Sequence, residues 1–242
     1  MLVTQTLEKL RALRLEGMAQ ALEEQRHQND LVSWGFEDRL ALLVERQWLW
    51  QENRGLVIRS KNAQLKISAS LEDLDYRSSR GLKRAQIEQL RASQWVKEHR
   101  NCLITGPTGS GKTYLACALG AQACRQGHRT RYFYAPKFFR ALETARADGS
   151  LLPLFKKLAR TALIIVDDLG IASVSGKLYR EFLEMLDDRQ GLGATLITSQ
   201  FPVSQWHEII ADPTVADAIL DRLVHNAYRI DLQGESMRKG KM

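Results

Sequence analysis

Short apolar runs alternate with amphipathic segments through the central and C-terminal parts of the chain. Five segments have the length and composition of strands: residues 102–105, 129–134, 162–166, 194–198 and 227–232. Continuous apolar runs are typical of parallel strands that are covered on both faces. Segments with helical periodicity separate the strands: residues 114–126, 136–147, 151–158, 177–189, 203–210 and 215–224. This alternation predicts an α/β fold, in which helices sandwich a parallel sheet.

The N-terminal part of the chain has only helical periodicity. Apolar residues recur at helical spacing over 7–22 and 36–48, with a polar loop expected between them. Ser33 predicts the start of the second helix, and Gly55 predicts its end. A short third helix is then expected at 56–65.

A serine-containing stretch separates these helices from the α/β segment, and one basic amphipathic helix is predicted at 83–97. We therefore expect three parts: a small all-helical N-terminal domain at 1–70, a linker at 71–82 and the α/β domain at 83–242.

The most specific motif lies between the first predicted strand and the helix after it. Its residues fill the phosphate-loop pattern G-x-x-x-x-G-K-[ST] at every fixed position: Gly106, Pro107, Thr108, Gly109, Ser110, Gly111, Lys112 and Thr113. Glycines in such a loop let backbone N–H groups surround phosphate oxygens at a helix N-terminus. We expect Lys112 to reach the β- and γ-phosphates, Thr113 to ligate Mg²⁺, and Tyr114 to complete the nucleotide-binding segment. The sequence thus predicts a protein that binds a nucleoside triphosphate and Mg²⁺.

A second acidic signature follows about fifty residues later. The apolar run 163–166 ends in Asp167 and Asp168. In a Walker B strand, the first carboxylate holds Mg²⁺ and the next acidic residue polarises the attacking water. Many motor ATPases have Glu at the second position. Asp168 is one methylene shorter, so we expect slow hydrolysis or hydrolysis that depends on neighbouring subunits.

Two further groups are candidates for the catalytic site. Thr198 and Ser199 end the strand at 194–198, where a hydroxyl can contact the γ-phosphate and the water; a turn-forming role is the alternative. Arg222 lies on a predicted helix near the end of the sheet and can project into the nucleotide site of the next subunit. A local ion pair with Asp217 or Asp221 is the alternative for this arginine.

The net charge of +7 is unevenly distributed. Residues 77–100 carry 7 basic and 2 acidic groups, and residues 125–160 carry 9 and 2, whereas 161–242 carry 8 and 12. Positive bands around a nucleotide site indicate either a nucleic-acid footprint or a solvated basic face. The candidate phosphate contacts are Lys137, Arg140, Lys156, Lys157 and Lys177.

Several runs of sequence resemble one family, and they extend over almost the whole chain. These are residues 13–19 (LRLEGMA), 39–46 (RLALLVER), the phosphate loop with 101–105 before it, 198–200 (TSQ) and 212–222 (DPTVADAILDR). The sequence resembles the AAA+ ATPases of the helicase-loader group, and most closely the IstB transposition helper ATPases of bacterial insertion sequences.

This resemblance implies an ATP-dependent homo-oligomer that assembles on duplex DNA, deforms it, and recruits and stimulates the cognate transposase. It makes Arg222 the arginine finger, which places nucleotide sites at subunit interfaces. It also makes Arg238 a possible second sensor of nucleotide, and the N-terminal helices a module for assembly and partner docking. A replicative helicase loader and a nucleotide-gated DNA scaffold with negligible hydrolysis are the alternatives, and a small-molecule P-loop kinase is a weaker one.

Other classes of function have little support in the sequence. His207 and Glu208 begin an H-E-x-x-H pattern, but Ala211 stands where the second zinc ligand belongs. Adjacent Asp167 and Asp168 do not form the spaced carboxylates of a DNA-cleaving enzyme. We expect no membrane span and no signal peptide, and three cysteines without a C-x-x-C pair fit a cytoplasmic protein.

Overall fold

The computed structural model describes residues 2–27, 34–76, 80–210, 212–234 and 236–237. Contacts divide the chain into two compact units, Met1–Ile58 and Arg59–Met242. This division falls inside a long helix. The functional boundaries at 70 and 83 stay predictions.

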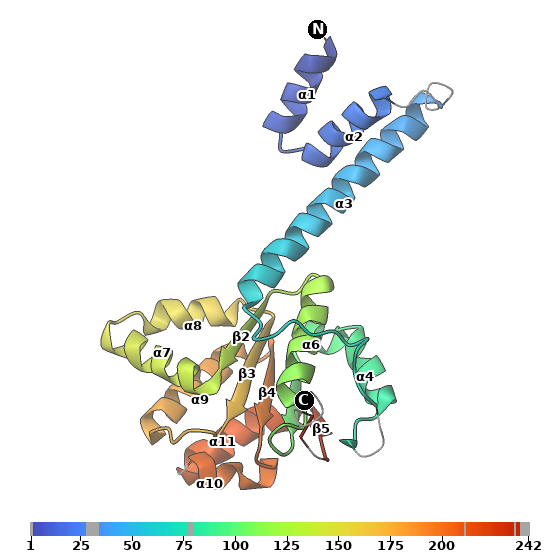
Figure 1. Ribbon diagram of the computed structural model, residues 1–242. Coiled ribbons are helices and arrows are strands. Elements are labelled where there is room, and N and C mark those ends of the chain that lie inside the picture. The colour runs from blue at the N-terminus through green and yellow to red at the C-terminus, as the bar shows by residue number, and fades with distance from the viewer. Residues whose placement is uncertain (1, 28–33, 77–79, 211, 235, 238–242) are drawn as a thin grey trace. The chain divides into compact units, whose positions relative to one another are not determined.

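Helices α1 (Leu2–Ala12), α2 (Glu16–His27) and α3 (Phe36–Ala63) begin the chain (Figure 1). Helix α2 meets α3 at Gly17, where an added Cβ would lie 2.7 Å from the carbonyl oxygen of Arg46 and from Cβ of Trp50. Beside this contact, the backbone N–H of Met18 donates to the side-chain oxygen of Gln47 at 3.1 Å. The glycine of the LRLEGMA run therefore permits a close helix–helix crossing.

The length of helix α3 shows that the predicted helix end at Gly55 was wrong. The helix continues through Gly55, where we expected one helix to end and another to begin. A glycine inside a helix costs only about 1 kcal/mol relative to alanine, and the good helix formers around it outweigh that cost. Helix α2 also extends to His27, into the predicted loop. Ser33 lies outside the described residues, so its predicted capping role stays a prediction.

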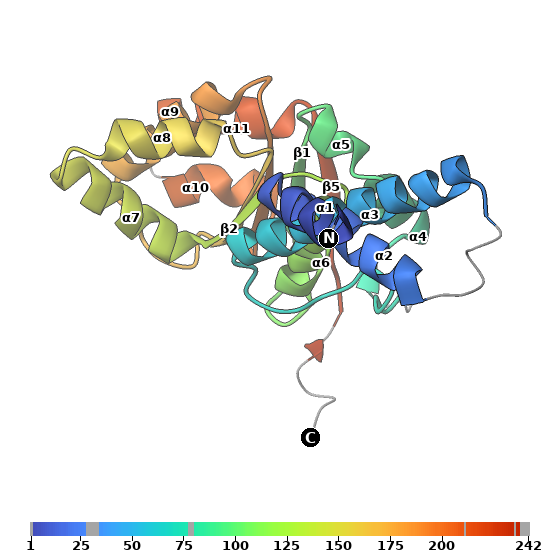
Figure 2. The ribbon, with the colours of Figure 1, turned by 90° about the horizontal axis from the view of Figure 1, so that it is seen from above.

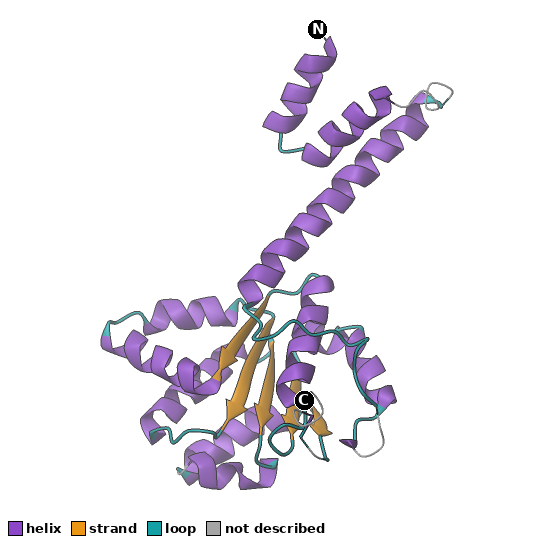
Figure 3. Cartoon of the chain, viewed as in Figure 1, coloured by secondary structure: helices purple, strands orange, loops and turns teal. Residues whose placement is uncertain are grey.

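The second unit contains a five-stranded parallel sheet in the order β2-β3-β4-β1-β5 (Figure 3). Its strands are β1 (Asn101–Thr105), β2 (Thr130–Tyr134), β3 (Leu163–Leu169), β4 (Ala194–Ser199) and β5 (Ala227–Asp231). Each of the five predicted strands is present, so the predicted α/β sheet is confirmed.

Helices cover both faces of the sheet, as Figure 2 shows from above. One group is α4 (Arg84–Arg91), α5 (Gln94–Lys97) and α6 (Lys112–Arg125). The other group is α7 (Ala135–Ala147), α8 (Leu151–Ala159), α9 (Gly176–Arg189), α10 (Trp206–Ile210, after the 3-10 turn η3, Val203–Gln205) and α11 (Pro213–Val224). Among the described residues, no helix is both long enough and apolar enough to cross a membrane.

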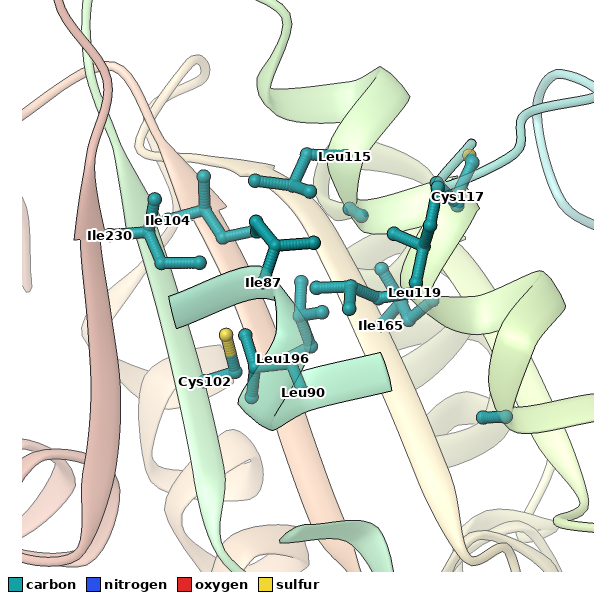
Figure 4. Close-up of a cluster of buried hydrophobic side chains, with 14 of the residues drawn as sticks. Ile87, Leu90, Cys102, Ile104, Leu115, Cys117, Leu119, Ile165, Leu196 and Ile230 are labelled. Atoms are coloured by element: carbon teal, nitrogen blue, oxygen red, sulfur yellow. The ribbon is translucent and has the colours of Figure 1, made fainter. Parts of the chain in front are cut away.

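Alternating residues of the strands enter two separate cores. Cys102, Ile104 and Leu196 pack against Ile87 and Leu90 of α4 on one face, as Figure 4 shows. On the other face, Leu103, Ile164 and Ile197 pack with Phe138 and Phe182. This alternation is the expected side-chain pattern of a strand.

The prediction of one continuous helix over 83–97 was also wrong. The segment forms two helices, separated by Ser93 in the left-handed region at φ 54°. In one continuous helix, Val96 would point away from the side that carries Ile87, because 3.6 residues make one turn. The break brings Trp95 and Val96 into the same core as Ile87. Burial of these two side chains therefore overrides the simple periodicity.

Candidate nucleotide-binding site

The phosphate loop connects the end of β1 to the start of α6. Gly111 precedes the helix at φ 95°, and no side chain caps the N-terminus of α6. A Cβ at Gly111 would lie 2.6 Å from Nη2 of Arg80, in a conformation that L-residues rarely adopt. The first backbone N–H groups of α6 thus have the arrangement that binds an anion.

Lys112 is buried beside this loop. Its ammonium donates to the carbonyl oxygens of Gly106 at 2.8 Å and Pro107 at 2.9 Å. The lysine is therefore folded over the loop that would receive the phosphates, which places its charge where the motif requires it.

Asp167 is the centre of the polar site. Its side chain is fully buried and accepts three hydroxyl hydrogen bonds. Thr113 donates at 3.0 Å, Thr198 at 2.7 Å and Tyr132 at 2.6 Å. A carboxylate and a threonine hydroxyl are hard oxygen ligands, so Thr113 and Asp167 fit Mg²⁺. The structure thus brings together the two residues predicted to hold the metal.

Tyr132 is a member of this site that the sequence analysis did not include. Burial, and then its hydrogen bond to Asp167, raise the pKa of its phenol, so the hydroxyl remains a proton donor. The only signal for it is its place in β2, where its neighbour in register on β3 is Ile165. Sequence alone does not give that register.

Asp168 differs sharply from Asp167. Its side chain is 23% exposed, and its backbone is in the left-handed region at φ 63°. Its N–H donates to Oγ1 of Thr198 at 2.8 Å. Thr198 therefore contacts both acidic residues, and the backbone strain is of a kind that concentrates at functional sites.

Ser199 is turned away from this group. Its hydroxyl donates to the carbonyl oxygen of Leu169 at 2.8 Å and accepts from the N–H of Phe201 at 3.2 Å. These bonds match the turn-forming alternative. The next residue, Gln200, instead reaches the phosphate loop, because its side-chain oxygen accepts from the hydroxyl of Thr108 at 3.1 Å.

Two other segments border the loop. Arg80 is buried and donates to the carbonyl oxygens of Asp75 at 2.7 Å and Ser110 at 2.9 Å. Near the C-terminus, the N–H of Met237 donates to the carbonyl oxygen of Gly109 at 3.0 Å. Arg238, predicted as a second sensor, lies outside the described residues. Tyr114 lies in the first turn of α6, and its hydroxyl donates to the carbonyl oxygen of Ser70 at 3.4 Å.

Arg222 lies at the opposite end of the strands. Asn101, the first residue of β1, donates from its side chain to the carbonyl oxygen of Arg222 at 2.8 Å, whereas the phosphate loop follows the last residue of β1. The guanidinium donates to Asp187 at 2.6 Å and to Asp221 at 3.5 Å. The structure therefore contains the predicted pair with Asp221, but its shorter bond goes to Asp187. Asp217, the other predicted partner of Arg222, instead has its Oδ1 3.6 Å from Nε2 of His207.

The candidate DNA contacts all lie on the α7–α9 face of the sheet, and all five side chains are exposed. Lys137 and Arg140 belong to α7, Lys156 and Lys157 to α8, and Lys177 to α9. The neighbouring aromatic residues Phe138, Phe139 and Tyr179 are buried in the core.

Sheet order, phosphate loop and acidic strand end together define the class of the protein: it is a P-loop NTPase with the AAA+ fold. Within that class, the chain belongs to the family of IstB-like ATP binding proteins, which matches residues 8–242.

Individual proteins agree with this assignment. The chain is 46% identical over 241 residues to an insertion sequence ATP-binding protein of Sinorhizobium fredii (strain NBRC 101917 / NGR234), covering 100% of this chain and 98% of that protein. Its fold is similar to a crystal structure of DnaI, with TM-score 0.56, 24% identity, and 68% of this chain and 91% of that chain covered. It is also similar to the replication initiator DnaA bound to AMPPCP and single-stranded DNA, with TM-score 0.56, 16% identity, and coverage of 71% and 52%.

Proposed function

We propose that this protein is a Mg²⁺-dependent ATPase that assembles as a homo-oligomer on duplex DNA and recruits and stimulates the transposase of its insertion sequence. The observation that carries the proposal is the position of Asp167, whose carboxylate joins Thr113 of the phosphate-loop helix to Thr198 of β4. One buried group thus connects the metal-binding and γ-phosphate-facing parts of the site.

Each residue has a defined part in hydrolysis under this proposal. The N–H groups around Gly111 and the ammonium of Lys112 bind the phosphates, while Thr113 and Asp167 hold Mg²⁺. The metal, when bound, neutralises charge on the β- and γ-phosphates. Asp168 orients the attacking water, and Thr198 fixes the position of Asp168 through its backbone N–H.

Arg222 supports oligomeric assembly. Because its carbonyl in α11 contacts the first residue of β1, Arg222 lies at the end of that strand opposite to the phosphate loop of its own chain. A site in a second copy is the one that it can complete, by stabilising the charge that develops during phosphoryl transfer. ATP would therefore promote assembly, because its γ-phosphate provides the partner for this arginine.

Different observations support the two proposed partners, the transposase and DNA. The relative from Sinorhizobium fredii is named for an insertion sequence. The exposed basic residues of α7, α8 and α9 supply positive charge that binds phosphates without reading sequence. These observations favour a nucleic-acid backbone as the surface for assembly, and the test below uses duplex DNA for it.

The test is the particle size on a duplex of about 50–60 base pairs, long enough for several subunits, at two salt concentrations. ATP, ADP, a slowly hydrolysed analogue and no nucleotide are compared. We expect a large, discrete complex only with a triphosphate, and none with Lys112→Ala. Addition of the transposase should then give a larger complex. Assembly of Lys112→Ala at the same ATP concentration would contradict ATP-gated assembly.

A second candidate is a nucleotide-gated DNA scaffold with negligible hydrolysis. The short side chain of Asp168 favours it, since its carboxylate lies 4.0 Å from the ammonium of Lys66 and is partly engaged there. Multiple-turnover phosphate release on DNA would exclude the scaffold. A preference for single-stranded DNA and a helicase, with no duplex complex, would instead indicate a helicase loader.

A further inference from the structure

A lysine outside every predicted motif contacts both acidic residues of the site. Nζ of Lys66 lies 3.7 Å from Oδ2 of Asp167 and 4.0 Å from Oδ2 of Asp168. The same ammonium lies 5.1 Å from the ring centroid of Tyr134, at the end of β2. Lys66 thus faces the carboxylate proposed to bind Mg²⁺.

Packing of the chain around Lys66 fixes this position. Just before it, Arg59 donates to the carbonyl oxygen of Cys124 at 2.9 Å, and Arg131 donates to the carbonyl oxygen of Asn62 at 2.9 Å. Leu65 packs against α6 so closely that a Cβ at Gly120 would lie 3.0 Å from its Cδ2. These contacts hold the backbone of Lys66 beside α6, so its side chain is directed to the carboxylates by the fold.

The charges explain why a cation belongs there. Asp167 is fully buried, and its three hydrogen-bond donors Thr113, Thr198 and Tyr132 are neutral hydroxyl groups. An ionised carboxylate in such a place is costly without a positive charge nearby. Lys66 supplies that charge, and its side chain remains 45% exposed to solvent.

We propose that Lys66 is the counter-charge of the magnesium site. Without metal, its ammonium partly neutralises Asp167, Asp168 and the bound phosphates. With metal, the two cations repel each other, so Lys66 weakens Mg²⁺ binding and reduces the dependence of ATP binding on Mg²⁺. This inference rests on the proposed binding of Mg²⁺ and ATP at this site, and it assigns Lys66 an electrostatic role and not a catalytic one.

The test measures binding of a fluorescent ATP analogue to the full-length protein in excess EDTA and in saturating Mg²⁺. The readout is the ratio of the two dissociation constants, EDTA over Mg²⁺. Lys66→Met removes the charge and retains an unbranched side chain, so we expect the ratio to rise about five- to tenfold, as for one charge a few ångströms away in a partly solvated site. Lys66→Arg should keep the wild-type ratio, as should Lys61→Met, which removes an exposed lysine of α3.

The outcomes separate the possible roles of Lys66. A merely structural role would change both dissociation constants together and leave the ratio unchanged, which would overturn the proposal. A fall in the ratio would also overturn it, because Lys66 would then support the metal-bound state. If Lys66→Met does not fold, Lys66→Gln gives the same comparison. Failure of the wild-type protein to bind the analogue in both conditions would refute the proposed function itself.

Discussion

The hydroxyl of Thr198 donates to the carboxylate of Asp167 at 2.7 Å and accepts the backbone N–H of Asp168 at 2.8 Å. A single side chain at the end of β4 therefore holds both acidic residues at the end of β3. Because one hydrogen bond goes to the carboxylate proposed to bind Mg²⁺ and the other to the strained residue after it, Thr198 links the two acidic residues of the candidate site.

Replacement of Thr198 tests this coupling. Thr198→Val keeps the shape but removes the hydroxyl, so Asp168 loses a hydrogen-bond partner and Asp167 a donor. We expect a stability loss of about 1–3 kcal/mol, as for unsatisfied buried polar groups. The rate of ATP hydrolysis, measured on DNA, should fall about ten- to a hundredfold, with little change in ATP affinity. Thr198→Ser is the control and should retain most activity; equal losses in both variants would contradict the role of the hydroxyl.

Asp168 should be needed for hydrolysis and not for assembly. Asp168→Asn keeps the size of the side chain but removes the negative charge proposed to act on the attacking water, so we expect phosphate release to fall at least about a hundredfold. ATP-dependent complexes on duplex DNA should persist longer than those of the wild type. Dissociation after dilution, followed by light scattering, checks this. Unchanged turnover would assign activation of the water to another residue.

Arg222 should act on the nucleotide of a neighbouring subunit. Arg222→Ala should bind ATP normally yet lose most hydrolysis. The guanidinium that is removed acts at the nucleotide site of the neighbouring subunit and not at the site of its own chain. Mixing it with Lys112→Ala, which has an intact arginine and a defective phosphate loop, should restore part of the activity. No recovery at any mixing ratio would exclude action between subunits.

The ion pair of Arg222 with Asp187 allows its contribution to the stability of the fold to be tested separately from the role of Arg222 in hydrolysis. Both side chains are partly exposed, at 32% and 44%, so the ion pair contributes little to folding. We expect Asp187→Asn to change the free energy of unfolding by less than about 1 kcal/mol. It should also release the guanidinium and leave hydrolysis equal to or faster than that of the wild type. A loss of hydrolysis as large as that of Arg222→Ala would show that Asp187 is required to position the arginine.

The crossing of α2 and α3 depends on the absence of a side chain at Gly17. Gly17→Ala places a methyl group 2.7 Å from the backbone oxygen of Arg46 and from Cβ of Trp50, so the helices must separate. Overpacking of this kind costs about 1–3 kcal/mol. Thermal unfolding should show this loss, whereas Gly149→Ala has no neighbouring atom within 4 Å and tests only the strain of its φ of 77°. A neutral effect of Gly17→Ala would mean that the crossing is loose.

Exposed lysines of α8 provide a test of DNA contact. If Lys156 and Lys157 each neutralise one phosphate, the double alanine variant should reduce the slope of log affinity against log salt by about two. The exposed Lys61 of α3 serves as the control and should leave the slope unchanged when replaced by alanine. An unchanged slope in the double variant would remove α8 from the DNA-binding surface.

Local patterns determined most of the fold. Strands β1, β3 and β4 are short apolar runs between turn-forming residues. Runs of this length and composition are typical of buried strands in a parallel sheet. The phosphate loop and the Asp167–Asp168 pair are motifs of consecutive residues, so their place at the ends of β1 and β3 follows from the sequence. Two predictions were wrong for different reasons: the helix formers around Gly55 outweigh its cost, so α3 continues through it, whereas burial of Trp95 and Val96 breaks the predicted helix 83–97.

The sequence by itself determined that this protein has a phosphate loop, an acidic strand end and the α/β alternation around them, because each of these depends on neighbouring residues. Only the tertiary structure decided what surrounds the carboxylate of Asp167. Tyr132 and Lys66 reach it from segments 35 and 101 residues away (167 − 132 and 167 − 66), while Arg222 lies at the other end of the sheet. Such contacts depend on strand register and on the path of the chain over α6. Long-range packing determines the register and the path, so neither can be predicted from local periodicity.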